Sequence, residues 1–413
     1  MNLERAVSSS KRIEMGFSLV QNGRFIGPPP GGFKELGSLF PTTFGVEVFP
    51  PFLIIRVRTL PPRPWPLAVA GMPLRLTVHE TDDCFDRGCV GRGPKVLQNF
   101  HLQRHDEFSE EILKGAITSF RDLHIRIHDI AWFGAFWRIT VPDGTDLKTV
   151  PSFIAHHGCY YKFRSEVTEG DPAALRANTP QGIEFDDFFY AKEVNALLRP
   201  GIMLSSSSRS TVEDGKINHQ YKSTTSGILI IDRYGNKFIT VATHGFESDG
   251  LVWHPTPEKG KIIGKIVDQL PGTDISIAKL NSGLRYTNET FGTRENPSGV
   301  QASGISPNYP PHTLVGDAIT MDNPFSGFCE GQIMALGTKI LGEGAEHIPH
   351  KWMIFENGDE PIDGSCGTAI LDEEKRVVGF FRYKLDNSGR CYAVSAMELR
   401  NHGYEIFGGE QTL

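Results

Sequence analysis

The stretch PIDGSCGTAILDEEKRVVGFFRY, residues 361–383, has the pattern of a tight turn followed by a β-hairpin. Two nucleophilic side chains, Ser365 and Cys366, stand next to each other in the turn, with glycine at positions 364 and 367. After the turn, the apolar runs GTAIL and VVGFFRY are separated by polar residues, which is typical of two strands joined by a second turn. The stretch therefore poses two questions: which residue attacks a substrate, and which base elsewhere in the chain activates it.

Similar short apolar runs with glycine turns recur upstream, about every dozen residues. GILIIDRYGNKFITVAT (227–243) predicts two strands around a DRYGN turn, and DISIAKL (274–280) and GQIMALG (331–337) predict further strands. About 200 residues of this pattern favour a pair of small β-barrels. The serine-rich segment PGIMLSSSSRSTVEDGK (200–216) predicts a linker in front of them. We therefore divide the chain into residues 1–204 and 205–413.

Residues 1–204 predict an α+β accessory region of unknown role. FLIIRV (52–57) and LRLTV (74–78) have the composition of strands, and WFGAFWRITV (132–141) resembles one buried strand. Residues 109–127 carry apolar side chains at helical spacing, although no capping box marks where the helix begins. The chain as a whole is expected to be mainly β, with helices concentrated in this first part.

Composition excludes several classes of protein. The net charge of −7 and the pI of about 6.1 give no basic excess for nucleic acid. We expect no membrane association, because no uncharged apolar run approaches eighteen residues, and no secretory signal opens the sequence. Six cysteines are too few for a disulfide scaffold of this length, so an intracellular, cytoplasmic protein with reduced thiols is expected. The oligomeric state stays open.

Acyl transfer by a side-chain nucleophile needs an attacking atom, a base, a group that orients the base, and donors for the oxyanion. Candidates for all four follow residue 205. His244 closes the predicted strand FITVAT, Asp274 opens the strand DISIAKL, and Cys366 lies in GSCG. This order and strand context resemble the trypsin/chymotrypsin-like peptidase fold, over residues 205–408.

Separate segments carry that resemblance. TSGILIIDRYGNKFITVATH is similar to the family's first hairpin and its catalytic histidine, and TDISIAKL to the strand that begins with the triad aspartate. VGDAITMDNPFSGFCEGQIMAL (315–336) resembles the opening of the second barrel. GSCGTAILDEEKRVVGFF is similar to the nucleophile loop and its hairpin, and CYAVSAMEL (391–399) to the last strand and helix.

The resemblance implies which residue attacks. In the family, glycine stands two residues before the nucleophile and directly after it, because a side chain there would block the oxyanion hole. Gly364 and Gly367 satisfy this rule for Cys366, whereas Ser365 would be flanked by Asp363 and a cysteine. Cys366 is therefore the expected nucleophile, as in the processing proteases of picornaviruses. The amides of Gly364 and Cys366 would form the oxyanion hole.

The implied function is an intracellular endopeptidase that cleaves a protein or peptide substrate through Cys366, His244 and Asp274, without a cofactor or metal. A thiol needs less activation than a hydroxyl, so loss of Asp274 should reduce activity less than loss of His244. Secreted members usually have aspartate just before the nucleophile, paired with a newly cut N-terminal amine. Ser365 stands there instead, so activation through a buried amine is not expected.

Specificity is expected to involve four residues near the nucleophile. In the family the pocket floor lies about six residues before it, which points to Glu360, and the wall includes Phe380, Phe381 and Arg382. Glu360 would favour a basic side chain, while the phenylalanines would narrow the cleft.

Two other functions stay open. The fold could have lost catalysis and serve as a peptide-binding or protein-binding interaction module. Alternatively, residues 1–204 could be the main functional part, as a partner-binding or autoinhibitory domain. A zinc site is also conceivable, because cysteine and histidine recur in two loops; its ligands would be Cys84, Cys89, His156, His157 and Cys159.

Overall fold

The computed structural model describes residues 12–21, 24–49, 52–61, 65–66, 68–78, 80, 88–98, 108–167, 197–207, 209–213, 216–290, 299–310, 312–341, 346–355, 361, 363–384, 390–408 and 411–412. By contacts between residues the chain divides into two compact units. The first unit comprises 1–167, 309–318 and 332–347, and the second comprises 168–308, 319–331 and 348–413. None of the described helices has the length and apolar character needed to cross a membrane.

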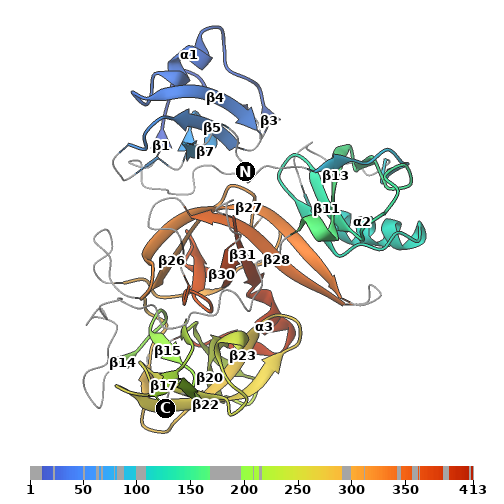
Figure 1. Ribbon diagram of the computed structural model, residues 1–413. Coiled ribbons are helices and arrows are strands. Elements are labelled where there is room, and N and C mark those ends of the chain that lie inside the picture. Colours follow the sequence, from blue (N-terminus) through green and yellow to red (C-terminus); the bar gives the residue numbers. More distant parts are fainter. Residues whose placement is uncertain are drawn as a thin grey trace. The chain divides into compact units, whose positions relative to one another are not determined.

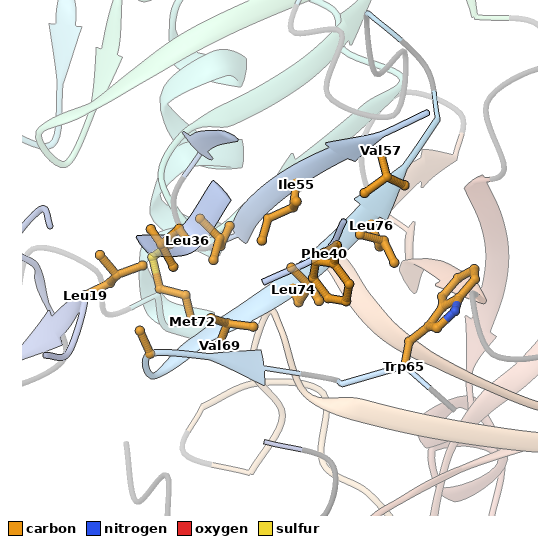
Figure 2. Close-up of a cluster of buried hydrophobic side chains, with 12 residues drawn as sticks. Leu19, Leu36, Phe40, Ile55, Val57, Trp65, Val69, Met72, Leu74 and Leu76 are labelled. Atoms are coloured by element: carbon orange, nitrogen blue, oxygen red, sulfur yellow. The ribbon is translucent and has the colours of Figure 1, made fainter. Parts of the chain in front are cut away.

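The first unit begins with a five-stranded sheet. Its strands, in spatial order, are β1 (Arg12–Ile13), β6 (Ala68–Val69), β7 (Met72–Thr77), β5 (Phe52–Val57) and β4 (Thr43–Phe49). A short hairpin of β2 (Val20–Gln21) and β3 (Arg24–Phe25) and the helix α1 (Gly32–Gly37) accompany it. Figure 2 shows apolar side chains of α1, β5 and β7 packed together, among them Leu36, Ile55, Met72 and Leu74. The predicted strands at 52–57 and 74–78 correspond to β5 and β7.

A second group of paired strands in the first unit contains β27 (Gly327–Leu341), of which residues 332–341 belong to this unit, β10 (Asp129–Trp132), β11 (Trp137–Val141), β13 (His157–Phe163), β12 (Phe153–Ile154) and β9 (Lys95–Val96). β8 (Cys89–Val90) pairs with β13, and the 3-10 helix Arg164–Glu166 follows β13. The prediction of one strand over 132–141 is wrong. The chain turns at Gly134, whose φ of 82° suits glycine, so this run divides between β10 and β11.

The helix predicted within 109–127 is α2 (Glu110–Asp122). The Ser109 hydroxyl caps it by accepting a hydrogen bond from the amide of Ile112 at 3.3 Å. Its helical stripe of apolar side chains is buried, comprising Ile112, Leu113, Ala116, Ile117 and Phe120. The helix therefore begins at a single capping serine rather than at a capping box.

The second unit contains an antiparallel eight-stranded sheet (Figure 1, green to yellow except for its last strand, near residue 405, which is red). Its order is β18 (Ser223–Thr225), β15 (Met203–Ser205), β21 (Leu251–His254), β22 (Lys261–Leu270), β23 (Ile275–Leu280), β20 (Lys237–Ala242), β19 (Leu229–Asp232) and β32 (Tyr404–Ile406). Smaller groups are the sheet β14 (Leu197–Leu198), β24 (Arg285–Tyr286) and β33 (Gln411–Thr412), and the hairpin β16 (Arg209–Glu213) and β17 (Lys216–Gln220).

The serine-rich segment does not behave as a linker throughout. Ser205 ends β15, and the side chains of Ser205 and Ser206 are fully buried. The Ser205 hydroxyl donates to the carbonyl of Pro255 at 2.7 Å and lies 3.3 Å from the Ser223 hydroxyl. Because these internal bonds satisfy the hydroxyls, a polar run can form part of a β-sheet core.

A second group of paired strands in this unit carries the stretch quoted at the outset. Its strands are β26 (Ala318–Asn323), β29 (Ala369–Asp372), β30 (Arg376–Lys384), β31 (Arg390–Ser395) and β28 (Glu346–Phe355), with β25 (Gly304–Ile305) paired to β30. The short helix α3 (Met397–Asn401) follows β31. The prediction of a mainly β chain with β-barrel sheets in its C-terminal half is confirmed.

Candidate active site

Strand pairing brings His244 and Asp274 together. Ala242, the last residue of β20, pairs with Ile275, the first residue of β23, in an antiparallel register. The residues just beyond these ends must therefore be neighbours, and the amide of Thr243 donates to the carbonyl of Asp274 at 2.9 Å. His244 then lies in the 3-10 helix Thr243–Gly245, opposite Asp274.

The carboxylate of Asp274 holds His244 at two points. Its Oδ2 atom lies 2.6 Å from Nδ1 of His244, and its Oδ1 atom accepts the backbone amide of the same residue at 3.0 Å. Asp274 has a φ of 65°, in the left-handed region that non-glycine residues seldom adopt. Side chains of both residues are mostly buried, at 14% and 10% exposed. A backbone held in such a conformation beside an oriented imidazole is typical of functional sites.

Cys366 lies in a turn shaped by its two flanking glycines. Gly364 and Gly367 have φ of 96° and 89°. A Cβ on Gly364 would lie 2.7 Å from the ring of Phe325, and one on Gly367 would lie 2.5 Å from the carbonyl oxygen of Thr225. Glycine is therefore required at both positions for conformation and for space.

Residues of strand β18 donate hydrogen bonds to the carbonyls of this turn. Thr225 donates from its hydroxyl to the carbonyl of Gly364 at 2.9 Å and from its amide to the carbonyl of Cys366 at 3.0 Å. The Thr224 hydroxyl donates to the same Cys366 carbonyl at 2.5 Å. The carbonyl of Ser365 accepts from the Thr368 hydroxyl at 2.6 Å. With each carbonyl engaged, the orientation of the intervening peptide groups is fixed.

The amides expected to form the oxyanion hole are not used elsewhere. Among the residues described, no protein acceptor takes a hydrogen bond from the amide of Gly364 or Cys366. Two such donors, on alternate residues of a rigid turn, are the requirement for stabilising a developing oxyanion.

The Cys366 thiol hydrogen-bonds to a backbone carbonyl rather than to the histidine. Cys366 is 4% exposed, and its Sγ donates to the carbonyl of Arg382 at 2.7 Å. No hydrogen bond joins Cys366 to His244, two residues that the structure describes. Burial raises the pKa of the Cys366 thiol far above its usual range, and the carboxylates of Asp274 and Asp363 raise it further. The resting group is therefore a neutral thiol.

Three of the four expected specificity residues lie in the described part of the chain, close to Asp274. Glu360 lies outside the described residues. Phe380 and Phe381 are both 4% exposed and line a cavity of about 10 Å³, next to Asp274. The Nε of Arg382 lies 3.6 Å from Oδ2 of Asp274, so its side chain faces the carboxylate that orients His244.

The conceivable zinc ligands form no cluster in the described part of the chain, where no three histidine, cysteine or acidic side chains gather. Cys84 lies outside that part. Cys89 is exposed, whereas Cys159 is buried and its thiol has a pKa raised by desolvation.

Several residues of the site were not found from the sequence. Thr224, Thr225 and the turn residues Asn323 and Ser326 contact the Cys366 loop through hydroxyl and amide groups. Short polar residues next to strands read as ordinary turn formers. The run NPFSG, between two predicted strands, was the only available signal for the second pair.

No protein family and no curated protein matches the chain by sequence. Among solved structures, a glutamic acid specific serine protease is similar to the chain at 14% sequence identity. The match covers 51% of this chain and 100% of that protease, with a TM-score of 0.38. Cellulomonas bogoriensis chymotrypsin is 14% identical, with 52% of this chain and 100% of the other covered and a TM-score of 0.34. Thermobifida fusca protease A is 15% identical, with 52% of this chain and 100% of the other covered and a TM-score of 0.36. At such low identity these are likenesses of fold alone.

Proposed function

We propose that the chain is an endopeptidase in which Cys366 attacks the peptide carbonyl, His244 moves the proton and Asp274 orients His244. The observation that supports the proposal is the hydrogen-bonded His244–Asp274 pair, whose Nδ1 and Oδ2 atoms lie 2.6 Å apart. The same unit contains a glycine-flanked cysteine turn with two amides that bind no acceptor among the described residues. An oriented base, a nucleophile and oxyanion donors are the parts that acyl transfer needs.

The raised pKa of the thiol defines how the first step would run. A neutral Cys366 cannot attack until it loses its proton, so the thiol must leave the Arg382 carbonyl and hydrogen-bond to Nε2 of His244. His244 takes the proton while the sulfur forms a bond to the carbonyl carbon, and the oxyanion sits on the amides of Gly364 and Cys366. The C–N bond then breaks, and His244 gives the proton to the leaving amine.

Water hydrolyses the resulting thioester by the same route. His244 removes a proton from the water while the water oxygen forms a bond to the thioester carbon, and the C–S bond then breaks. The carboxylic acid product leaves, and His244 returns the proton to the sulfur. Asp274 stays ionised throughout and keeps Nδ1 as the protonated nitrogen. A reducing, intracellular compartment would suit this chemistry, because the described cysteines, Cys366 included, are free thiols.

One observation favours a second candidate, a non-catalytic interaction module. Cys366 is 4% exposed and bonded to a backbone carbonyl, the usual state of a structural cysteine. In this alternative the site would hold peptides or a partner without cleaving them.

Two reagents that need no knowledge of the substrate distinguish these candidates. p-Nitrophenyl acetate acylates an activated thiol, and iodoacetamide alkylates an accessible one; peptide mass mapping locates both products. The endopeptidase requires acetylation at Cys366 that is lost in Cys366→Ala and falls about 10²-fold or more in His244→Ala. Cys89→Ala is the control, because this exposed thiol should react without the help of His244. Acetylation that is no faster at Cys366 than at Cys89 would favour the interaction module.

A further inference from the structure

The turn between β26 and β27 is joined to the Cys366 loop by a buried polar network. Asn323 is fully buried, and its Oδ1 accepts three hydrogen bonds. Two come from the amides of Phe325 and Ser326, at 3.0 and 2.9 Å, and shape the turn itself. The third comes from the hydroxyl of Ser365, at 3.2 Å, and crosses to the loop that carries the nucleophile.

A second contact runs through two hydroxyls. The Oγ atoms of Ser326 and Ser365 lie 2.9 Å apart, and Ser365 is fully buried. Since Ser365 uses its hydrogen on Asn323, the hydroxyl of Ser326 is the donor in this pair. Within the part of the chain that the structure describes, the hydrogen-bond partners of the Ser365 side chain therefore come from the Asn323–Ser326 turn.

The third contact is steric. The ring of Phe325 covers Gly364 so closely that a Cβ there would approach it to 2.7 Å. On the other side, the hydroxyl of Thr225 holds the carbonyl of Gly364. Gly364 and Ser365 are thus fixed between the turn and β18, and no acceptor among the described residues binds the amide of Gly364 or Cys366.

We propose that the Asn323–Ser326 turn is a positioning element that holds the Cys366 loop in its acylation-ready form in the intact chain. The proposal rests on the function inferred above and adds its regulation: the contacts described for Gly364 and for the side chain of Ser365 come from Thr225 and from the Asn323–Ser326 turn. No newly cut terminus or added ligand is required, so the uncleaved protein is competent for acylation.

Acylation and alkylation separate positioning from simple stability. Attack on p-nitrophenyl acetate develops an oxyanion and needs the two amides, whereas displacement of iodide from iodoacetamide develops none. Asn323→Ala removes the common acceptor, and Ser365→Ala removes the loop's end of the network. Each is expected to slow acetylation of Cys366 by about 10²-fold, the usual effect of a lost oxyanion donor, with alkylation changed less than about threefold.

A conservative variant tests the role of the acceptor. The Nδ2 group of Asn323 has no hydrogen-bond partner among the described residues, so Asn323→Asp loses no bond and keeps the oxygen that binds Ser365. It should restore acetylation to within about tenfold of wild type. Ser205→Ala is the matched control, a buried serine also paired to a serine, 3.3 Å away, in the other sheet of this unit. It should lower stability but not the ratio of the two rates.

The outcomes are distinct. Acetylation that is unchanged in Asn323→Ala and Ser365→Ala, or that falls in step with alkylation, overturns the positioning role and leaves the endopeptidase standing. A wild type whose Cys366 is not acetylated faster than Cys89 overturns the proposed function itself. An intact wild type that acetylates only after limited proteolysis overturns the regulatory part. Should Asn323→Ala fail to fold, Ser326→Ala removes a single hydroxyl and carries the same comparison.

Discussion

The Oδ2 atom of Asp274 lies between two basic groups, 2.6 Å from Nδ1 of His244 and 3.6 Å from Nε of Arg382. Its other oxygen is committed to the backbone amide of His244. This carboxylate therefore fixes both the position and the tautomer of the imidazole.

Replacing Asp274 by asparagine should lower the rate of Cys366 acetylation about 10- to 100-fold, because the amide group would favour the wrong histidine tautomer. The loss should be smaller than in His244→Ala, since a thiol depends less on full activation than a hydroxyl does. Burst kinetics with p-nitrophenyl acetate measure both. Asp232→Asn, at a carboxylate that binds the turn amides of Tyr234 and Asn236, is the control. A larger effect at Asp274 than at His244 would contradict this assignment.

The alkylation rate of Cys366 should rise with pH throughout the range from 6 to 9. Burial raises the pKa of this thiol, so the thiolate fraction is small at neutral pH and grows about tenfold per pH unit. A preformed thiolate–imidazolium pair would instead give a rate that levels off below pH 7. Quenched iodoacetamide labelling with mass mapping distinguishes the two profiles, and the exposed Cys89 supplies an internal reference in the same digest.

Alanine at Gly367 should destabilise the fold by several kcal/mol and abolish acylation. The substitution adds a strained left-handed backbone, about 1 to 3 kcal/mol, to a clash with the Thr225 carbonyl 2.5 Å away. Gly235→Ala is the matched variant, because Gly235 has a φ of 85° but nothing within 4 Å of a Cβ. The difference in unfolding free energy between the two variants measures the contribution of the clash with the Thr225 carbonyl. Equal values would show that the loop shifts to relieve the clash.

Lys351 makes the stability of the fold depend on pH. Its side chain is buried, and its Nζ donates to the side chain of Asn308 at 3.1 Å and to the carbonyl of Val378 at 2.9 Å. Burial lowers the pKa of Lys351 to about 7 in the folded chain, despite the carboxylate of Asp372, which acts in the opposite direction. An unfolded lysine titrates near pH 10.4.

Between about pH 7 and pH 10 the unfolded chain thus keeps a proton that the folded chain has released, and the free energy of unfolding rises with pH. Lys351→Met removes this dependence. The stability of wild type relative to the variant should therefore increase by about 1.4 kcal/mol per pH unit in this range, measured by urea unfolding. The exposed Lys279, replaced by Met, should give no such slope. A flat difference for Lys351→Met would mean that the lysine stays charged when folded.

Local patterns allowed prediction of the hairpins that carry His244. The run 227–243 shows apolar residues on both sides of a polar turn, and β19 and β20 form as expected around Gly235. The end of β20 and the start of β23 then place His244 and Asp274, because antiparallel strand ends meet.

Long-range polar contacts could not be predicted in the same way. Ser326 and Ser365 are far apart in the chain and meet only through the sheet that joins them. The hydrogen bond from the Cys366 thiol to the carbonyl of Arg382 is another such contact, which no sequence pattern encodes. Likewise, the lysine in HKWMIF reads as a solvent-facing strand residue, yet burial and two acceptors place it inside.

The way β27 is shared along the chain limits how the protein can be dissected. Residues Leu336–Lys339 pair with Asp129–Trp132 of β10, so a sheet of the first unit depends on a strand that follows His244 in the sequence. A fragment beginning at residue 205 would contain β27 but not β10. In that fragment β27 would lack its partner β10, and its unpaired amides and carbonyls would favour self-association. Dissection by point substitution in the whole polypeptide avoids that artefact.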